Sequence, residues 1–216
     1  EVFILVCVSL ALAYIFLPGS FLVVVSSSLL LGVIYSIGPV RLKKRPFLDI
    51  LANAAGSGIL NTLAGWLASG GQGDDFIVLL PYPLAVSAVH LASTLADLEG
   101  DRRTGLRTTG VLLGRGPSMT VATILMAAAA GAAFLTSNKP ALYASLLSLP
   151  FFLLPLGGRK PVGRARDPLL PAKASTVMFC VAAGFYFPLF IPFVAVVVVL
   201  TRVYYSRRFS LKYPSI

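Results

Sequence analysis

The sequence predicts an all-α fold, a multi-span transmembrane helical bundle, and three observations lead to this prediction. The 216 residues are 57% hydrophobic and only 12% charged, and the mean hydropathy is +0.87, which is too apolar for an ordinary soluble domain. The apolar residues fall into runs of roughly 20, the length that a helix needs to cross a bilayer. Turn signals separate these runs. We expect about seven spans in one transmembrane domain, residues 1–216.

The first four predicted spans are divided by residues that favour turns or carry charge. Pro18-Gly19 ends the first run, a basic segment ends the second, and Gly70–Gly73 ends the third. Helices joined by such short turns must pack antiparallel. The four runs are Val2–Leu17, Phe21–Ile37, Phe47–Ser69 and Phe76–Ala96.

Three further runs complete the predicted bundle. The last run is longer than one crossing requires, and Pro188 and Pro192 interrupt it. We expect one long, kinked helix here, which would leave the basic C-terminal tail outside, whereas two short helices would return the tail to the inside. The three runs are Met119–Thr136, Ala141–Leu156 and Ala174–Tyr205.

Basic residues are concentrated in the loops on one side of the predicted bundle. By the positive-inside rule these loops are cytoplasmic, so we expect an integral protein of the cell (plasma) membrane, with membrane lipids as partners. This topology explains the net charge of +10, and we expect no nucleic-acid partner. The basic side carries Arg41, Lys43, Lys44, Arg45, Arg102, Arg103, Arg107, Arg115, Arg159, Lys160, Arg164, Arg166 and Lys173, and the other side carries Lys139, Asp74 and Asp75.

The strongest candidate for chemistry is the acidic end of the fourth span. Asp97 and Asp101 are four residues apart, so on a helix both carboxylates project from one face, one turn apart. Mg²⁺ takes few carboxylates and keeps its other sites for water and phosphate oxygens, so this pair is a candidate magnesium site. The alternative is a solvated cap, in which these acids and Glu99 pair with the neighbouring arginines Arg102, Arg103 and Arg107.

A second cluster follows the second span on the same side of the membrane. Tyr35 precedes a loop that contains Arg41 and Lys43, followed by Lys44 and Arg45. The cations of such a loop could clamp a diphosphate. The alternative is a topology signal that binds anionic lipid head groups.

Polar residues also occur inside the apolar sequence of the third and fourth spans. Those of the third span recur at every fourth position, which on a regular helix makes one continuous polar face. We expect its acidic member to face a wet cavity or a partner, and its two asparagines to contact substrate or bridge helices. His90, the sole histidine, is expected to be a core hydrogen-bonding residue or a substrate contact. The four residues of the third span are Asp49, Asn53, Ser57 and Asn61.

Together these motifs resemble the UbiA superfamily of intramembrane prenyltransferases. The resemblance spans nearly the whole chain and implies an all-helical bundle, of about nine spans when complete. Family members also carry an earlier Asn-Asp-x-x-Asp motif, which is absent here, so we expect the chain to be N-terminally truncated and to begin after it. The matching positions are Tyr35-Ser36, Arg41-x-Lys43, Asp97-x-x-x-Asp101 with Glu99-Gly100, then Gly105, Thr109 and Leu113-Gly114.

The resemblance implies Mg²⁺-dependent transfer of a prenyl group from a polyprenyl diphosphate donor to a lipophilic acceptor within the membrane. Asp97 and Asp101 would be catalytic and would bind Mg²⁺ and the diphosphate. Tyr35, close to the allylic carbon, and Lys43 are the other catalytic candidates. The predicted substrate-binding residues are Arg41, Asp49, Asn53, His90 and Arg102.

Alternatives remain open both for the acceptor substrate and for the general function of the protein. The stretches Val89–Leu98 and Arg45–Asp49 look similar to carotenoid-elongating members, while quinone-ring, chlorophyllide and glycerol-phosphate acceptors remain open. The polar helix faces would also suit a membrane transporter or channel subunit, although transporters usually show internal repeats and midplane ionisable sites. A catalytically inactive fragment is the third hypothesis.

Overall fold

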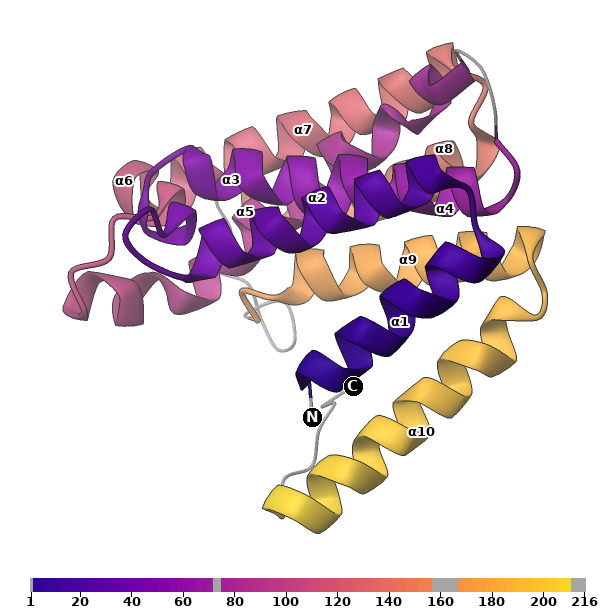
Figure 1. Ribbon diagram of the computed structural model, residues 1–216. Coiled ribbons are helices and arrows are strands. Elements are labelled where there is room, and N and C mark those ends of the chain that lie inside the picture. The colour runs from indigo at the N-terminus through magenta and orange to yellow at the C-terminus, as the bar shows by residue number, and fades with distance from the viewer. Residues whose placement is uncertain (1, 72–74, 157–166, 211–216) are drawn as a thin grey trace.

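The computed structural model describes residues 2–71, 75–156 and 167–210. Throughout these ranges the regular elements are helices, and Figure 1 shows most of them lying alongside one another in a bundle. The prediction of an all-α, multi-span bundle is confirmed. Several charged residues used in the topology prediction lie outside the described residues, namely Arg159, Lys160, Arg164, Arg166 and Asp74.

The first half of the chain forms three of the predicted spans. Pro18 separates the first two helices, and the third span is one continuous helical run whose middle is π-helical. A short 3₁₀ turn, η1, lies in the basic loop between the second and third spans. In order, the elements are α1 (Val2–Phe16), α2 (Gly19–Ser36), η1 (Leu42–Lys44), α3 (Leu48–Asn53), η2 (Ala54–Leu60) and α4 (Asn61–Ala68).

The second half contains the longest helix, α5, and the helices that pack around it. Pro81 begins α5, and Gly105, with a φ of 70°, follows its end. Proline is favoured at the first position of a helix and glycine just after its end. In order, the elements are η3 (Asp75–Leu79), α5 (Pro81–Arg103), α6 (Thr109–Leu113), α7 (Arg115–Leu135), α8 (Lys139–Leu153), η4 (Leu154–Leu156), α9 (Leu170–Tyr186) and α10 (Phe190–Phe209).

The helices have the length and composition of membrane spans. Within the described ranges, 5 helical segments are long and apolar enough to cross a bilayer, and α9 and most of α1 are shorter apolar helices. No residue of α2 or α10 is buried, and several large apolar side chains of each helix are exposed, as expected for helices that face lipid. The chain is therefore an integral membrane protein. The 5 segments are Gly19–Ser36, Phe76–Arg103, Arg115–Leu135, Lys139–Leu156 and Phe190–Phe209.

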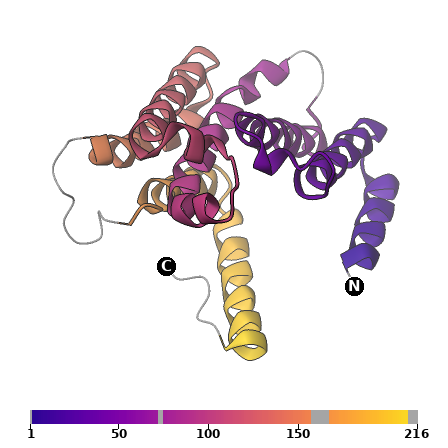
Figure 2. The same ribbon diagram turned by 90° about the vertical axis from the view of Figure 1, so that its left-hand side faces the viewer.

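The core lies where α7 packs against α5 and α8. Small residues dominate this interface, and they let helices approach closely in a membrane, where apolar burial alone does not drive association. Phe152 of α8 and Met126 of α7 fill the space between the alanines. Figure 2 shows α1 and α10 at the periphery of this bundle. The buried core residues are Ala85, Ala88, Leu91, Ala92, Leu95, Met119, Ala122, Met126, Ala129 and Phe152.

The prediction of one long helix at the C-terminal end is wrong. The chain breaks after Tyr186, and α10 begins at Phe190. Pro188 has no N–H to continue the helix and disfavours a helical conformation at the residue before it, and Phe187 accordingly has φ −128° and ψ 80°. Because α9 and α10 run in opposite directions along the bundle (Figure 1), the end of α10 returns toward the end of the bundle that holds α6.

The continuous polar face predicted for the third span is also not formed. The π-helical segment η2 changes the register after Asn53, so Ser57 is exposed and Gly58 is turned into the bundle. A Cβ at Gly58 would lie 2.5 Å from Cα of Pro83 on α5. The π-helix therefore presents a residue without a side chain where the backbone of α5 passes closest.

Candidate functional site

The two loops singled out in the sequence lie at one end of the bundle. The basic loop joins α2 to α3, and the acidic end of α5 is followed by the loop that leads into α6; Figure 1 shows both connections at the same end. Direct hydrogen bonds join them, because Thr109 of α6 contacts both Phe47 and Asp49 at the start of α3.

The predicted helical spacing of the acidic residues is present. Helix α5 continues without interruption to Arg103, so Asp97 and Asp101 occupy one face, one turn apart. His90 lies seven residues before Asp97 and shares this face, roughly 10 Å further along the helix axis. A polar stripe thus runs from the end of α5 toward the middle of the bundle.

Asp97 and Asp101 differ in their surroundings. Asp97 is exposed, and the side chain of Asp101 is half-buried and accepts a hydrogen bond of 3.3 Å from the hydroxyl of Thr108. No ion pair within 4 Å joins either carboxylate to Arg102, Arg103 or Arg107. The ion pairs on which the solvated-cap alternative depends are therefore not formed.

The donor set of this acidic pair is compatible with Mg²⁺. Among the described residues there is no cluster of three or more His, Cys, Asp or Glu side chains that could hold a metal, so a closed all-protein site is not present there. Two carboxylates one turn apart suit an ion that keeps most of its coordination for water and phosphate oxygens. Asp97 and Asp101 would be the protein ligands of such an ion.

A hydrogen-bonded network occupies the space between α2, α3 and α5. The amide nitrogen of Asn53 lies 3.2 Å from the hydroxyl oxygen of Tyr35 and 3.3 Å from Nε2 of His90, and it donates to the carbonyl oxygen of Asp49 at 3.0 Å. Asn53 thus brings together three of the predicted site residues. Because Asn53 donates to the Tyr35 oxygen, the Tyr35 hydroxyl proton is left to point elsewhere.

Asp49 is buried, with 1% of its surface exposed. Its two oxygens accept hydrogen bonds from the backbone N–H groups of Ile50 and Thr109, each at 2.9 Å, and from the Thr109 hydroxyl. The sequence analysis expected a partner or a wet cavity for this carboxylate, and the structure supplies a partner. The sequence did not identify Thr109 as that partner; the one available signal was that Thr108-Thr109 stands at the start of a short helix, where threonines favour capping positions.

The predicted basic residues are exposed and form no ion pair with Asp97 or Asp101. Arg41 adopts a left-handed backbone conformation, with a φ of 41°, and the exposed Lys43 follows it in η1. Arg102 lies beside Gly114, where a Cβ would be 4.0 Å from its guanidinium. Neither Arg41, Lys43 nor Arg102 forms an ion pair with any other described residue, so all three remain available to an anionic ligand.

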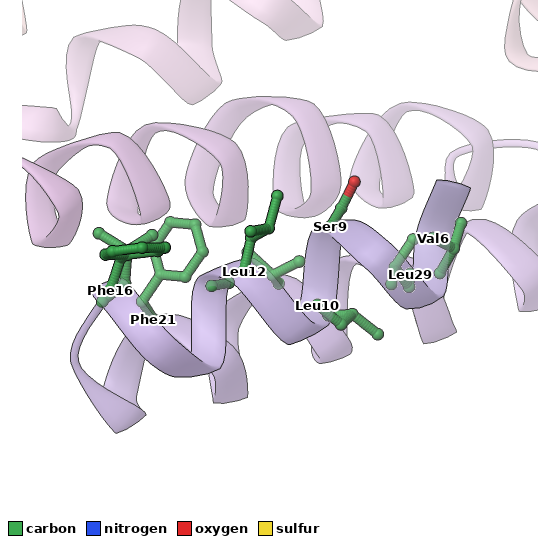
Figure 3. Close-up of a pocket in the computed structure, with 10 residues that line it drawn as sticks. Val6, Ser9, Leu10, Leu12, Phe16, Phe21 and Leu29 are labelled. Atoms are coloured by element: carbon green, nitrogen blue, oxygen red, sulfur yellow. The ribbon is translucent and has the colours of Figure 1, made fainter. Parts of the chain in front are cut away.

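Two surface grooves lie away from this polar region. One groove, about 690 Å³, runs between α1 and α2 and has Ser9 as its only polar lining residue; Figure 3 shows the apolar side chains that surround it. A second groove, about 390 Å³, lies between α4, η3 and the start of α5, and Trp66 forms part of its wall. Neither contains a group able to activate a phosphate ester, so we do not assign the chemistry to them.

Comparison with known proteins identifies the family. Two lycopene elongase/hydratases, from Haloarcula japonica and Haloferax volcanii, are each 34% identical to this chain, over 113 and 84 residues. The matched segments cover 51% and 39% of this chain, but only 38% and 27% of the two relatives' own lengths. No solved structure matches. The model of the UbiA prenyltransferase family matches residues 2–173, and the chain therefore belongs to the UbiA prenyltransferase family.

Proposed function

We propose that the chain carries out Mg²⁺-dependent transfer of a prenyl group from a polyprenyl diphosphate to a lipophilic acceptor at the membrane. The observation that carries this proposal is the hydrogen-bonded contact of Phe47 and Asp49, at the end of the basic loop, with Thr109 of α6, which follows the acidic end of α5 at one end of a membrane-spanning bundle. Family membership supports it against the transporter alternative.

The residues divide the reaction between binding and charge stabilisation. Asp97 and Asp101 would hold Mg²⁺, which when bound would neutralise charge on the diphosphate oxygens. Arg41 and Lys43 approach the same diphosphate from the basic loop and stabilise the negative charge that grows as the allylic C–O bond breaks. The diphosphate leaves with the bonding electron pair.

The allylic cation that remains is captured by an electron-rich carbon of the acceptor. The π electrons of an acceptor double bond form the new C–C bond, and the resulting cation loses a proton or is captured by water. Tyr35, in the last turn of α2 just before the basic loop, offers an aromatic face and a hydroxyl oxygen. An aromatic face attracts a cation. The surrounding apolar helices limit access of water to the reactive carbon.

We infer a carotenoid-type acceptor. Two relatives are described as lycopene elongase/hydratases, and a long polyene would be taken directly from the bilayer that surrounds the outward-facing apolar helices. The membrane orientation in which the basic loops face the cytoplasm, as the positive-inside rule predicts, would place the diphosphate site where water-soluble donors are available.

The test uses membranes that contain the chain, supplied with Mg²⁺, a series of radiolabelled polyprenyl diphosphates and lycopene. Replacement of Asp97 by Asn should slow formation of the prenylated product by about 10²-fold or more, because one preorganised charge stabiliser is lost. Glu99→Gln is the matched control, because Glu99 is also exposed but points away from the face shared by Asp97 and Asp101. Equal rates for Asp97→Asn and the unaltered chain would contradict the proposal, and absence of product from the unaltered chain would favour the inactive-fragment alternative.

A further inference from the structure

Asp49 has no room to serve as a substrate ligand in this conformation. It is the one buried side chain with a formal charge among residues 2–71, 75–156 and 167–210 whose exposure is described, and 1% of its surface is exposed. Three protein donors occupy its oxygens. A carboxylate buried and hydrogen-bonded in this way contributes to the protein around it, since the same groups would be left unpaired if it turned toward a ligand.

Thr109 forms hydrogen bonds with both Asp49 and Phe47. Its hydroxyl donates to Asp49 and accepts a 2.6 Å hydrogen bond from the backbone N–H of Phe47, while its own N–H donates to the other Asp49 oxygen. Thr109 itself is fully buried. Phe47 has a φ of 65°, a conformation that a bulky residue adopts only when its surroundings hold it there. The Thr109 hydroxyl is thus one of the contacts that hold the end of the basic loop.

The contact between Asp49 and Thr109 joins the ends of the two loops that form the proposed diphosphate site. Lys43 and Arg41 precede Phe47 in the basic loop, and on the other side Thr108 donates a hydrogen bond to Asp101. A shift of Thr109 would therefore change the position of the cations relative to the metal-binding carboxylates. Asp49 and Thr109 lie 60 residues apart in sequence, so local structure alone cannot fix this register.

We propose that Asp49 and Thr109 are positioning residues, a latch that sets the distance between the basic loop and the acidic end of α5. This inference rests on the proposed function for its catalytic consequence, but not for its structural one. It replaces the substrate contact that the sequence suggested for Asp49 with a role exerted through Lys43, Arg41 and Asp101.

The structural test measures the distance between the two loops directly. Spin labels are attached to cysteines introduced at the exposed positions Val40 and Thr104, in a chain whose native Cys7 and Cys180 are replaced by serine. The distribution of distances between the two labels is recorded by double electron–electron resonance in lipid nanodiscs. Breaking the latch with Thr109→Val should broaden or shift this distribution.

The matched control is Thr123→Val in α7. Thr123 is also a buried threonine, and its hydroxyl bonds the carbonyl oxygens of Met119 and Phe152 at 2.8 and 3.2 Å in the helix core. Thr123→Val should leave the distance between the labels unchanged, and Thr109→Ser, which keeps the hydroxyl, should restore the original distribution. Equal distributions for Thr109→Val and the parent chain, or equal broadening by Thr123→Val, would overturn the proposal.

The functional test separates positioning from loss of fold. With Mg²⁺ present, binding of inorganic pyrophosphate measured by calorimetry should weaken at least about tenfold in Thr109→Val and stay unchanged in Thr123→Val. Prenyl transfer should fall by about 10²-fold, the loss expected from a misplacement of about 1 Å. Retention of both pyrophosphate affinity and turnover in Thr109→Val would refute the catalytic consequence.

A measurement on the unaltered protein tests the latch even if the Thr109→Val variant does not fold. The latch predicts that the Thr109 amide exchanges with solvent much more slowly than the amides of exposed residues Thr104 and Arg107 in the same loop. Exchange of Thr109 at their rate would overturn the latch. If the unaltered chain neither binds pyrophosphate nor transfers a prenyl group, the proposed function fails, while the label distances and amide exchange still decide the latch.

Discussion

Replacing Gly110 by alanine should release α6 from α5 and expose the loop that carries Thr108 and Thr109. Gly110 is buried in α6, and a Cβ at this position would lie 2.6 Å from the hydroxyl oxygen of Thr94 on α5 and 3.3 Å from its Cβ. The first distance is well below van der Waals contact. Either Thr94 or the short helix α6 must therefore move.

The free-energy cost of Gly110→Ala follows from the crowding of the added Cβ against Thr94. Overpacking a tightly packed site costs about 1–3 kcal/mol, and because about 1.4 kcal/mol corresponds to a factor of ten in an equilibrium constant, the population of the detached α6 should rise about 5- to 150-fold. Alanine has a better helix propensity than glycine by about 1 kcal/mol, so the net cost is at most about 2 kcal/mol and the net rise in the detached population at most about 30-fold.

Hydrogen exchange followed by mass spectrometry measures this detachment. Amides of residues 104–113 should exchange faster in Gly110→Ala, by up to that net factor, whereas Gly131→Ala, where a Cβ meets nothing within 4 Å, should leave them unchanged. Combining Gly110→Ala with Thr94→Ala removes the 2.6 Å contact and should restore most of the protection. Protection equal to that of the unaltered chain in Gly110→Ala, or no recovery in the double variant, would refute the reasoning.

Two further predictions concern other parts of the chain. Gly58→Ala should destabilise the packing of η2 on α5 by about 1–3 kcal/mol, because its Cβ would meet the backbone of Pro83; unfolding in mixed micelles should show no such loss for Gly65→Ala, which meets nothing within 4 Å. The 2.8 Å hydrogen bond from Lys173 holds the pKa of Asp167 below its ordinary value, so the pair stabilises the start of α9 above the ordinary aspartate pKa of about 3.9 and loses this effect as pH falls through the lowered pKa. Lys173→Met should raise the pKa of Asp167 in a carboxyl-carbon NMR titration, and an unchanged pKa would contradict the assignment.

The features that depend on local sequence could be predicted. The helix boundary at Pro18 follows from the missing N–H of proline and its fixed φ, and the shared face of Asp97 and Asp101 follows from helical periodicity. Composition alone indicated a membrane protein. These predictions succeeded because each requires only residues within one or two helical turns of each other.

The features that depend on tertiary contacts could not be predicted in this way. Pro188 allowed either a kink or a complete break, and the outcome depends on packing: α9 has buried positions, including Ser175 and Gly184, whereas none of α10 is buried. The π-helical register at Gly58 depends on the approach of Pro83, 25 residues later. The pairing of Asp49 with Thr109 spans 60 residues and cannot be derived from the periodicity of either segment.

The contrast between Asp49 and Asp97 shows why residue type and location were insufficient to assign roles. Both are aspartates at the same end of the bundle, but Asp49 is buried among three protein donors and Asp97 is exposed without a hydrogen-bond or ion-pair partner among the described side chains. A buried carboxylate that turns away from its protein donors to reach a cation leaves those donors unsatisfied, which costs about 1–3 kcal/mol for each buried group. An exposed, unpartnered carboxylate carries no such penalty. The hydrogen bonding of each side chain therefore supports the proposed metal binding by Asp97 and the proposed loop positioning by Asp49, and the two roles should separate when pyrophosphate binding and loop distance are measured on the same variants.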